Sequence, residues 1–205
     1  MRPRSTRVPD DRVIFLQQFL RNPRQIGSVI PSSRYLERRV VALADIAHAR
    51  TIVELGTGTG GITRAVLTAM PADARLVGIE INPRLHQLLS GFDDPRLIAH
   101  FGSAEQLAEI LRRHQLPPPD VVVSGIPFST MDRELGSRVL AAIAAALAPG
   151  GRFVAYQVSA QVARLARPVL GTPRRQIELR NIPPMRVYRW DRPAETPAVQ
   201  RAVGT

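Results

Sequence analysis

Residues 51–61 read TIVELGTGTGG, continue as ITRAVLTAM, and decide the fold. β-branched apolar residues lead to an acidic residue, Glu54, which is followed by glycines at alternate positions, Gly56, Gly58 and Gly60. An apolar pattern with helical spacing comes next, so the stretch predicts a strand, a tight loop and a helix. Glycine is required where the backbone turns through positive φ or approaches a ligand closely. Because free N–H groups at a helix N-terminus also favour an anionic group, the stretch predicts a ligand-binding loop.

The glycine spacing separates two classes of cofactor loop. The dinucleotide fingerprint is G-x-G-x-x-G with an acidic residue about 20 residues further on. Here the pattern is E-x-G-x-G-x-G, and a second acidic residue, Glu80, closes the next apolar run. This arrangement resembles the S-adenosylmethionine loop of the class I methyltransferases, which implies that the loop wraps the methionine part of the cofactor and that Glu80 takes both ribose hydroxyls. A glycine-rich turn without a ligand is the alternative, and the later strands favour the methyltransferase interpretation.

Length and composition limit the possible architectures. A chain of 205 residues is expected to form one domain with a core that needs no covalent staples. It contains no cysteine, which excludes disulfides and thiolate metal sites and fits a reducing compartment. No apolar stretch approaches the ~18 residues of a spanning helix, and the N-terminus MRPRSTRVPDDR lacks the apolar segment of a signal peptide. We therefore expect a soluble, cytoplasmic monomer without a bound metal.

The charge of the chain is strongly one-sided. The formal net charge is +11, and all 28 basic residues are arginine, a bias that we attribute to genome composition rather than to function. The positive excess attracts polyanions, which means nucleic acid or an anionic membrane surface. Composition alone does not choose between these partners.

The first 24 residues are predicted to form a basic leader and an amphipathic helix. Asp10 or Asp11 can cap a helix that runs to about Arg21. Phe15 and Phe19 lie on its apolar face, with glutamines opposite. The pattern fits both an interfacial helix that lies among lipid headgroups and an ordinary helix packed on the domain.

The segment between this helix and the first strand holds two prolines and a glycine, which forbid one continuous helix. Ser32 or Ser33 can cap a further helix, predicted for residues 34–47. Because the segment directly precedes the first strand, we expect it to lie close to the glycine loop and to close over the ligand. Ser32 is accordingly a candidate for cofactor binding.

Beyond the first strand, strands and helices alternate regularly. Further strands are predicted at residues 75–80, 96–101, 120–124, 152–158, 176–181 and 185–190. The apolar run VVV in the fourth fits a strand buried on both faces, and the short Ile-Pro-Pro link between the last two predicts an antiparallel hairpin at the sheet edge. The fold class predicted is α/β and Rossmann-like, with a seven-stranded, mostly parallel sheet and an N-terminal helical extension. The methyltransferase domain should cover residues 25–190, with a flexible tail at 191–205.

Ligands of such sheets bind at the carboxyl ends of the strands. From the first two strands, the residues expected there are the glycine loop with Thr57, and Glu80 with Ile81. After the third strand come Ser103 and Ala104. Class I methyltransferases usually have an Asp, or Asp-Ala, at this place to hold the adenine amino group. Here the backbone or Ser103 would have to supply that contact.

The fourth strand ends in SGIPF, residues 124–128. Enzymes that methylate the exocyclic amine of adenine usually place Asn or Asp, then Pro and an aromatic residue, at this corner. Ser124, Pro127 and Phe128 keep part of that pattern, but a hydroxyl lacks the paired donor and acceptor of an amide. We assign Ser124 and Phe128 to the catalytic corner, and Ser124 also to the cofactor contacts. The alternative for Phe128 is a core residue of a buried turn.

Four stretches together are more specific, namely FLQQFLRNPRQIGSVIPSSRYL, VELGTGTGGIT, VSGIPFSTM and LRNIPPMRVYRW. Over about residues 15–190 they resemble the soluble bacterial phospholipid N-methyltransferases, which convert phosphatidylethanolamine to phosphatidylcholine with S-adenosylmethionine. The resemblance implies an amphipathic N-terminal helix bound to the anionic inner face of the cell membrane. It also implies that phosphatidylethanolamine and its mono- and dimethylated forms are successive substrates, and that nucleic acid is not a partner.

The implied chemistry asks the protein mainly to align the amine with the methyl group and to exclude water. A headgroup ammonium must lose a proton before it can attack, and a desolvated aromatic pocket would lower its pKa and suit the methylated cations. From position in the sequence, Tyr35, Phe128 and Tyr156 are candidates for that wall. His100 and Tyr35 are candidate proton acceptors. The basic run at residues 174–189 is either a lipid phosphate site or a solvated arginine face.

Two other hypotheses stay open at this point. An RNA adenine N-methyltransferase is compatible with the charge, although Ser124 replaces the usual Asn or Asp and no added RNA-binding domain is recognisable. A non-catalytic membrane or nucleic-acid binder on the same fold is the other. The intact acidic residues and glycines, Glu54 and Glu80 above all, argue against the latter.

Overall fold

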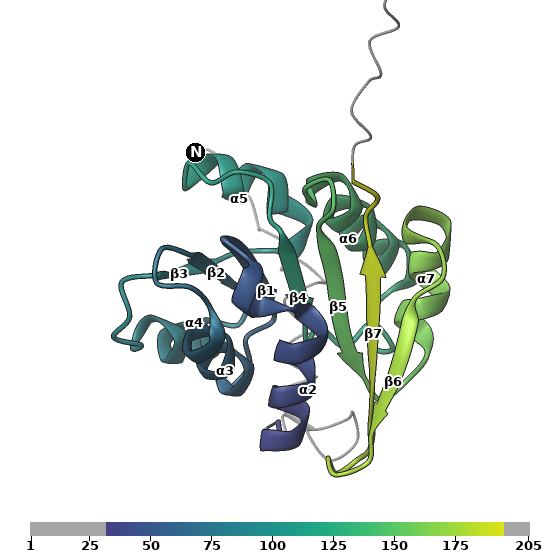
Figure 1. Cartoon of the computed structure of the whole chain (residues 1–205). Helices are drawn as coiled ribbons and strands as arrows, with labels where there is room; N and C mark the ends of the chain where they lie inside the picture. Colours follow the sequence, from purple (N-terminus) through teal and green to yellow (C-terminus); the bar gives the residue numbers. More distant parts are fainter. Residues whose placement is uncertain (1–31, 195–205) are drawn as a thin grey trace, which may run out of the picture. The chain divides into compact units, whose positions relative to one another are not determined.

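The computed structural model describes residues 32–194, and the predicted leader and first helix lie outside that range, as does most of the predicted tail. Figure 1 shows the arrangement of the elements. In chain order they are α2 (Arg34–Ala44), a 3-10 turn η1 (Ile46–His48), β1 (Thr51–Leu55), α3 (Gly61–Ala69), β2 (Arg75–Glu80), α4 (Pro83–Ser90), β3 (Leu97–Phe101), η2 (Ala104–Gln106), α5 (Leu107–Arg113), β4 (Val121–Ser124), α6 (Arg133–Ala146), β5 (Arg152–Gln157), α7 (Gln161–Leu170), β6 (Arg174–Glu178) and β7 (Met185–Asp191).

The described strands form one seven-stranded sheet in the order β3-β2-β1-β4-β5-β7-β6. The five strands from β3 to β5 are parallel, whereas β7 runs antiparallel to both β5 and β6. This confirms the predicted Rossmann-like α/β class with its C-terminal hairpin. Every residue of β1 and β4 is buried, because helices cover both faces of the sheet.

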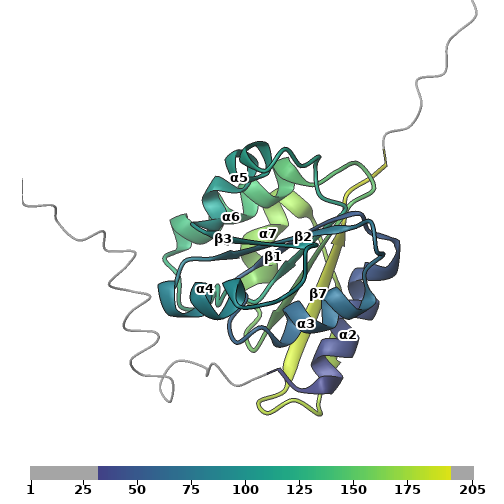
Figure 2. The same ribbon diagram turned by 90° about the vertical axis from the view of Figure 1, so that its left-hand side faces the viewer.

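Two layers of helices enclose the sheet (Figure 2). On one face, α2 and α3 pack on a cluster that includes Ile52, Val121 and Val154. On the other face, α5, α6 and α7 pack on a cluster that includes Val53, Val122 and Phe153. Neighbouring residues of one strand thus belong to different clusters, since side chains alternate between the faces of a strand.

Helix α2 ends earlier than the sequence predicts. It was expected to reach residue 47, but Asp45 adopts the left-handed conformation with φ of 50° and its N–H returns to Ala42 and Val41. Aspartate tolerates this conformation better than most residues, so it can end a helix as glycine does. The start of α2 agrees with the prediction, since the Ser33 side chain accepts the N–H of Leu36.

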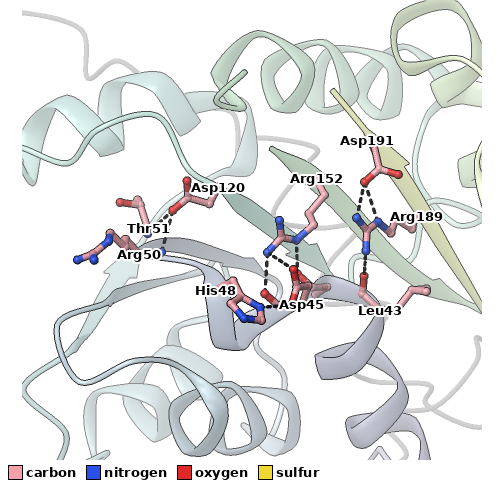
Figure 3. A network of polar contacts seen from close by, with 10 residues as sticks. Leu43, Asp45, His48, Arg50, Thr51, Asp120, Arg152, Arg189 and Asp191 are labelled. Carbon is pink, nitrogen blue, oxygen red and sulfur yellow. Dashed lines mark hydrogen bonds and ion pairs between the residues drawn. The ribbon is translucent and has the colours of Figure 1, made fainter. Parts of the chain in front are cut away.

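Two arginines hold the carboxyl end of α2 against the sheet (Figure 3). Arg152 on β5 donates to the carbonyls of Ala44 and Asp45, and Arg189 on β7 donates to the carbonyl of Leu43 at 2.8 Å. The last carbonyls of a helix lack partners within it and carry partial negative charge, so cations are favourable there. These contacts lie at the amino edge of the sheet, where the parallel strands begin.

The C-terminal hairpin differs from its prediction, because β6 begins two residues earlier and ends three residues earlier than expected. Strand β6 pairs from Arg174 to Glu178 with β7, rather than over residues 176–181. The hairpin loop is therefore longer, at residues 179–184. Beyond β7, which includes Asp191, the Arg192 N–H donates to the carbonyl of Gly151 at 2.8 Å, so the chain is still paired where the tail was expected to begin.

An aromatic stack lies under β7 at the amino edge. Trp190 is buried and stacks on Phe153 with ring centroids 5.1 Å apart, and Tyr188 packs beside it. The indole N–H donates to the carbonyl of Gly171 at 3.2 Å, which satisfies its only polar group.

Candidate active site

The candidate site lies at the carboxyl edge of the sheet, meaning the edge at which the parallel strands end. Gly56, Gly58 and Gly60 all have positive φ, of 73°, 55° and 80°. The Gly56 N–H donates to the carbonyl of Ile79 at 2.9 Å, which holds the loop between β1 and α3 against the end of β2. A Cβ built on Gly58 would meet no atom within 4 Å, so the middle of the loop borders open space.

Glu80 faces this loop from the end of β2. One carboxylate oxygen accepts the N–H of Asn82 at 2.9 Å, and the other accepts the N–H of Gly58 at 3.3 Å. Thr57 donates to the same second oxygen at 3.5 Å. Burial raises the pKa of Glu80, while the backbone hydrogen bonds oppose that shift. The carboxylate is thus held in place beside the glycine loop.

Glu54 lies on the same face of the sheet and is fully buried. Its Oε2 accepts the Thr63 hydroxyl at 2.7 Å, whereas Oε1 is buried without a hydrogen-bond partner among the described residues. Burial, reinforced by the charge of Glu80, raises the pKa of Glu54 to about 8, against the opposing effect of the Thr63 hydrogen bond. An unpaired buried carboxyl oxygen is unfavourable, so this site is suited to a cationic or hydrogen-donating ligand.

Tyr156 joins this cluster from the end of β5. Its ring and hydroxyl lie over Gly125, where any Cβ would collide with the hydroxyl and approach Cζ to 2.7 Å. Burial, followed by the charges of Glu54, Glu80 and Glu37, raises the pKa of Tyr156. The phenol therefore keeps its proton at neutral pH.

The start of α2 lies against Gly61, the first residue of α3, whereas most of the segment that was expected to close over the ligand lies outside the described residues. A Cβ on Gly61 would lie 2.7 Å from Glu37 Oε1 and 3.8 Å from the Ser32 Cβ. Burial raises the pKa of Glu37, and the nearby charge of Arg64 opposes this. Glu37 was not singled out from the sequence, because one acidic residue in the first turn of a helix has no pattern that separates it from a helix-dipole residue.

Ser124 and Phe128 are not brought together with this cluster. The Ser124 side chain is fully buried on the α6 face, and its hydroxyl accepts the N–H of Ile126 at 3.3 Å. Phe128 is fully buried in the cluster beneath α6 and α7, near Gly136. Of the two interpretations of Phe128, the structure supports the core residue of a buried turn, because the turn after β4 directs its ring into the core.

His100 and Tyr35 have partners elsewhere. His100 lies on edge strand β3 and contacts His114, with Nδ1 and Nε2 3.0 Å apart; burial and then the His114 charge lower the pKa of His100. Two strands separate β3 from β4, a distance of about 14 Å at ~4.8 Å per strand, so His100 and Ser124 cannot contact one amine. The Tyr35 ring contacts Arg180, whose Cζ lies 4.3 Å from the ring centroid.

The third loop of the edge has a backbone arrangement that fits its expected role. The Gly102 N–H donates to the carbonyl of Glu80 at 3.2 Å, which places the loop next to Ile81. The Ser103 hydroxyl caps the turn η2 by accepting the N–H of Glu105 at 3.4 Å, and Ala104 is buried. Ser103 thus organises the loop, and its backbone rather than an acidic side chain borders the edge.

The arrangement fits S-adenosylmethionine. The open space at Gly58, the fixed carboxylate of Glu80 and the unpaired oxygen of Glu54 provide room, an acceptor for hydroxyls, and an acceptor for a cationic group. No cluster of three or more metal-binding side chains occurs among residues 32–194. Fold and site together are those of a class I S-adenosylmethionine-dependent methyltransferase.

Comparison with known proteins agrees with that class. The ornithine lipid N-methyltransferase of Singulisphaera acidiphila is 33% identical over 147 residues, which cover 70% of this chain and 76% of that enzyme. The chain therefore belongs to this family of S-adenosylmethionine-dependent methyltransferases, and S-adenosylmethionine is its cofactor. No family model matches the chain.

Two further likenesses were found at lower identity. The ribosomal RNA small subunit methyltransferase A of Phenylobacterium zucineum is 27% identical over 164 residues, covering 68% of this chain and 54% of that enzyme. The N-methyltransferase NodS of Bradyrhizobium japonicum, solved with S-adenosyl-L-homocysteine, superposes with a TM-score of 0.66 at 14% identity over 87% of this chain and 98% of that one. At this identity the structural match supports the fold alone.

Proposed function

We propose that the chain methylates the primary amine of a membrane lipid with S-adenosylmethionine, and that phosphatidylethanolamine and its mono- and dimethylated forms are its substrates, phosphatidylcholine being the product. The observation that carries the lipid assignment is the identity over most of the chain to an enzyme named for N-methylation of ornithine lipid. That name makes ornithine lipid the second candidate substrate. Both lipids present an alkyl amine.

S-adenosylmethionine supplies an activated methyl group, and the residues of this chain supply alignment and a dry site. The glycine loop and Glu80 hold the ligand, while Glu37 on α2 and Ser32 just before that helix lie beside Gly61 at the end of the loop. Because its pKa is raised, Tyr156 cannot serve as a base in the tyrosinate form. Its oxygen can still accept a hydrogen bond from an incoming ammonium and orient it. Burial of the lipid ammonium beside Tyr156 lowers the pKa of that ammonium, which favours release of its proton to solvent.

An RNA adenine N-methyltransferase is the second candidate, since a ribosomal RNA methyltransferase is among the relatives. The corner after β4 argues against it. The Ser124 hydroxyl is buried and bonded to the Ile126 N–H, so it does not offer an acceptor to an adenine amine. Phe128 does not offer a stacking face, because its ring is fully buried.

The test is methyl transfer from radiolabelled S-adenosylmethionine to three substrates in parallel: phosphatidylethanolamine in anionic vesicles, ornithine lipid in the same vesicles, and total RNA. We expect label in mono-, di- and trimethylated phosphatidylethanolamine. Label in ornithine lipid alone would make ornithine lipid the substrate and would leave the assignment as a lipid N-methyltransferase unchanged. Label in RNA alone would overturn the proposal. Glu80→Gln serves as the inactive control, and Glu109→Gln, at an exposed position of α5, as its matched active control.

A further inference from the structure

The hairpin loop at residues 179–184 exposes large apolar side chains. Leu179 is 73% exposed and Ile182 is 82% exposed, and they are the most exposed large apolar residues of the part that the structure describes. Ile177, at the end of β6, adds a third at 45%. Exposed apolar side chains that gather in one loop beside charged residues are a feature of protein and membrane interaction sites.

The loop projects from the same edge of the sheet as the candidate active site. Strand β7 is antiparallel to β5, and its Arg186 is paired with Gln157 at the carboxyl end of β5. The loop that precedes β7 therefore lies at the carboxyl edge, as do the glycine loop, Glu80 and Tyr156. Figure 1 shows the loop beside the start of α2. A partner that covers the loop would face the substrate side of the enzyme.

Arginines surround the apolar residues. Arg180 lies within the loop, Arg186 follows it, and Arg38 lies on the neighbouring surface of α2. A groove of about 440 Å³ lies between α2 and β6, and its lining includes Tyr35, Arg38, Arg39, Glu178 and Arg180. The acidic member, Glu178, is buried and already paired with Arg39 at 2.7 Å. The accessible charge of the groove is positive.

The loop is fastened rather than loosely attached. The Asn181 side chain is buried, accepts the N–H of Ser33 at 3.0 Å and donates to the carbonyl of Pro183 at 3.0 Å. Glu178 accepts the N–H of Arg180 at 3.0 Å. Leu179 and Ile182 are thus presented by a fixed turn, so ordering them on a partner costs little conformational entropy.

We propose that this loop is a membrane-docking element: Leu179 and Ile182 insert among the headgroups and upper acyl chains of an anionic bilayer, while the surrounding arginines bind lipid phosphates. Apolar side chains beside cations are the combination that binds an anionic lipid surface, because the apolar groups enter the acyl region while the cations meet the headgroup phosphates. This docking site deepens the proposed function and rests on it, since docking through the loop would turn the carboxyl edge of the sheet toward a lipid substrate. The positive charge of the groove also complements an anionic surface.

The experiment is co-sedimentation of the full chain with vesicles of phosphatidylglycerol and phosphatidylcholine. The Leu179→Ser/Ile182→Ser double variant should bind about tenfold or more weakly, because two large apolar side chains no longer enter the interface. The matched control is Val169→Ser, which replaces an apolar residue 46% exposed near the end of α7. It lies at the opposite edge of the sheet and should leave binding unchanged. Equal binding by the double variant and the wild type would overturn the proposal.

A second pair of variants tests the arginines. Arg38→Ala/Arg180→Ala should flatten the increase of binding with phosphatidylglycerol content, whereas Arg112→Ala, at an exposed position of α5, should not. If these variants lose binding to total RNA but still bind vesicles as the wild type does, the surface is assigned to nucleic acid and the proposal is overturned. Sedimentation needs no catalysis, so weaker binding of the loop variant supports docking even if lipid methylation fails. If the loop variant methylates vesicle lipid at the wild-type rate, the proposed lipid methylation stands and the docking role of the loop is refuted.

Discussion

Replacing Glu54 by glutamine should stabilise the fold and weaken cofactor binding. The pKa of Glu54 is raised from 4.5 to about 8 by burial, so between these pH values the folded protein holds a proton that the unfolded chain releases. The free energy of unfolding therefore falls as pH rises, by about 1.4 kcal/mol per unit across that window, and stays at its lower level above pH 8. At pH 7 the accumulated loss is on the order of 3 kcal/mol. Glutamine cannot titrate and can still accept the Thr63 hydroxyl at the same position.

The assay is urea unfolding followed by circular dichroism at several pH values from 5 to 8, for the wild type, Glu54→Gln and the exposed control Glu109→Gln. The difference in stability between Glu54→Gln and the wild type should be small at pH 5 and grow to a few kcal/mol at pH 8. The control should follow the wild type. Parallel curves for wild type and Glu54→Gln would refute the assignment of a buried, raised pKa. Calorimetry should show weaker S-adenosylmethionine binding by Glu54→Gln. Once the amide oxygen accepts the Thr63 hydroxyl, an NH₂ group takes the place of the unpaired Oε1, and that group cannot accept a hydrogen bond from the ligand.

Three other substitutions test the remaining parts of the structure. Glu80→Ala should lower the affinity for S-adenosylmethionine by about a hundredfold or more in calorimetry, because charged hydrogen bonds are lost, with an unchanged far-ultraviolet spectrum; unchanged affinity would contradict the site. Gly125→Ala should destabilise by about 1–3 kcal/mol in urea and lower kcat, since the new Cβ displaces Tyr156. Arg152→Ala should destabilise by about 2 kcal/mol without changing cofactor affinity, because it frees the carbonyls of Ala44 and Asp45 at the end of α2. If the Arg152→Ala variant is as stable as the wild type, these hydrogen bonds make no net contribution to the free energy of unfolding.

The fold was predictable from sequence because buried parallel strands and glycine turns leave local patterns. The β-branched residues of β1, the apolar run of β4 and the glycines between β1 and α3 were sufficient for the sheet. The end of α2 was not, because an aspartate in the left-handed conformation has no pattern that separates it from a helical aspartate. The start of β6 depends on pairing with β7, which is a tertiary contact.

The acidic residues and glycines of the candidate site were predicted because they lie at the ends of strands or directly after them. The direction of the other side chains was harder to read. Strand alternation places Glu54 on the α2 and α3 face, and Ser124 and His100 toward the opposite helices. The direction of the Phe128 side chain is set by an irregular turn. Because such a turn has no repeating pattern of apolar residues, the sequence does not indicate which way the ring points. Tyr35 points to Arg180 because α2 packs beside the hairpin, a contact between segments far apart in the chain.

The aromatic stack at the amino edge has a practical consequence. Trp190 is the only tryptophan of the chain, and it lies buried on Phe153 at the start of β5, whereas the candidate site and the hairpin loop lie at the opposite edge. Its fluorescence should therefore report exposure of the core during unfolding and stay unchanged when cofactor or vesicles are added. Since all strands of the sheet are hydrogen-bonded in one series, the signal from this single indole follows the loss of the whole sheet. The protein thus carries its own optical probe of folding, spatially separate from the candidate site and from the hairpin loop.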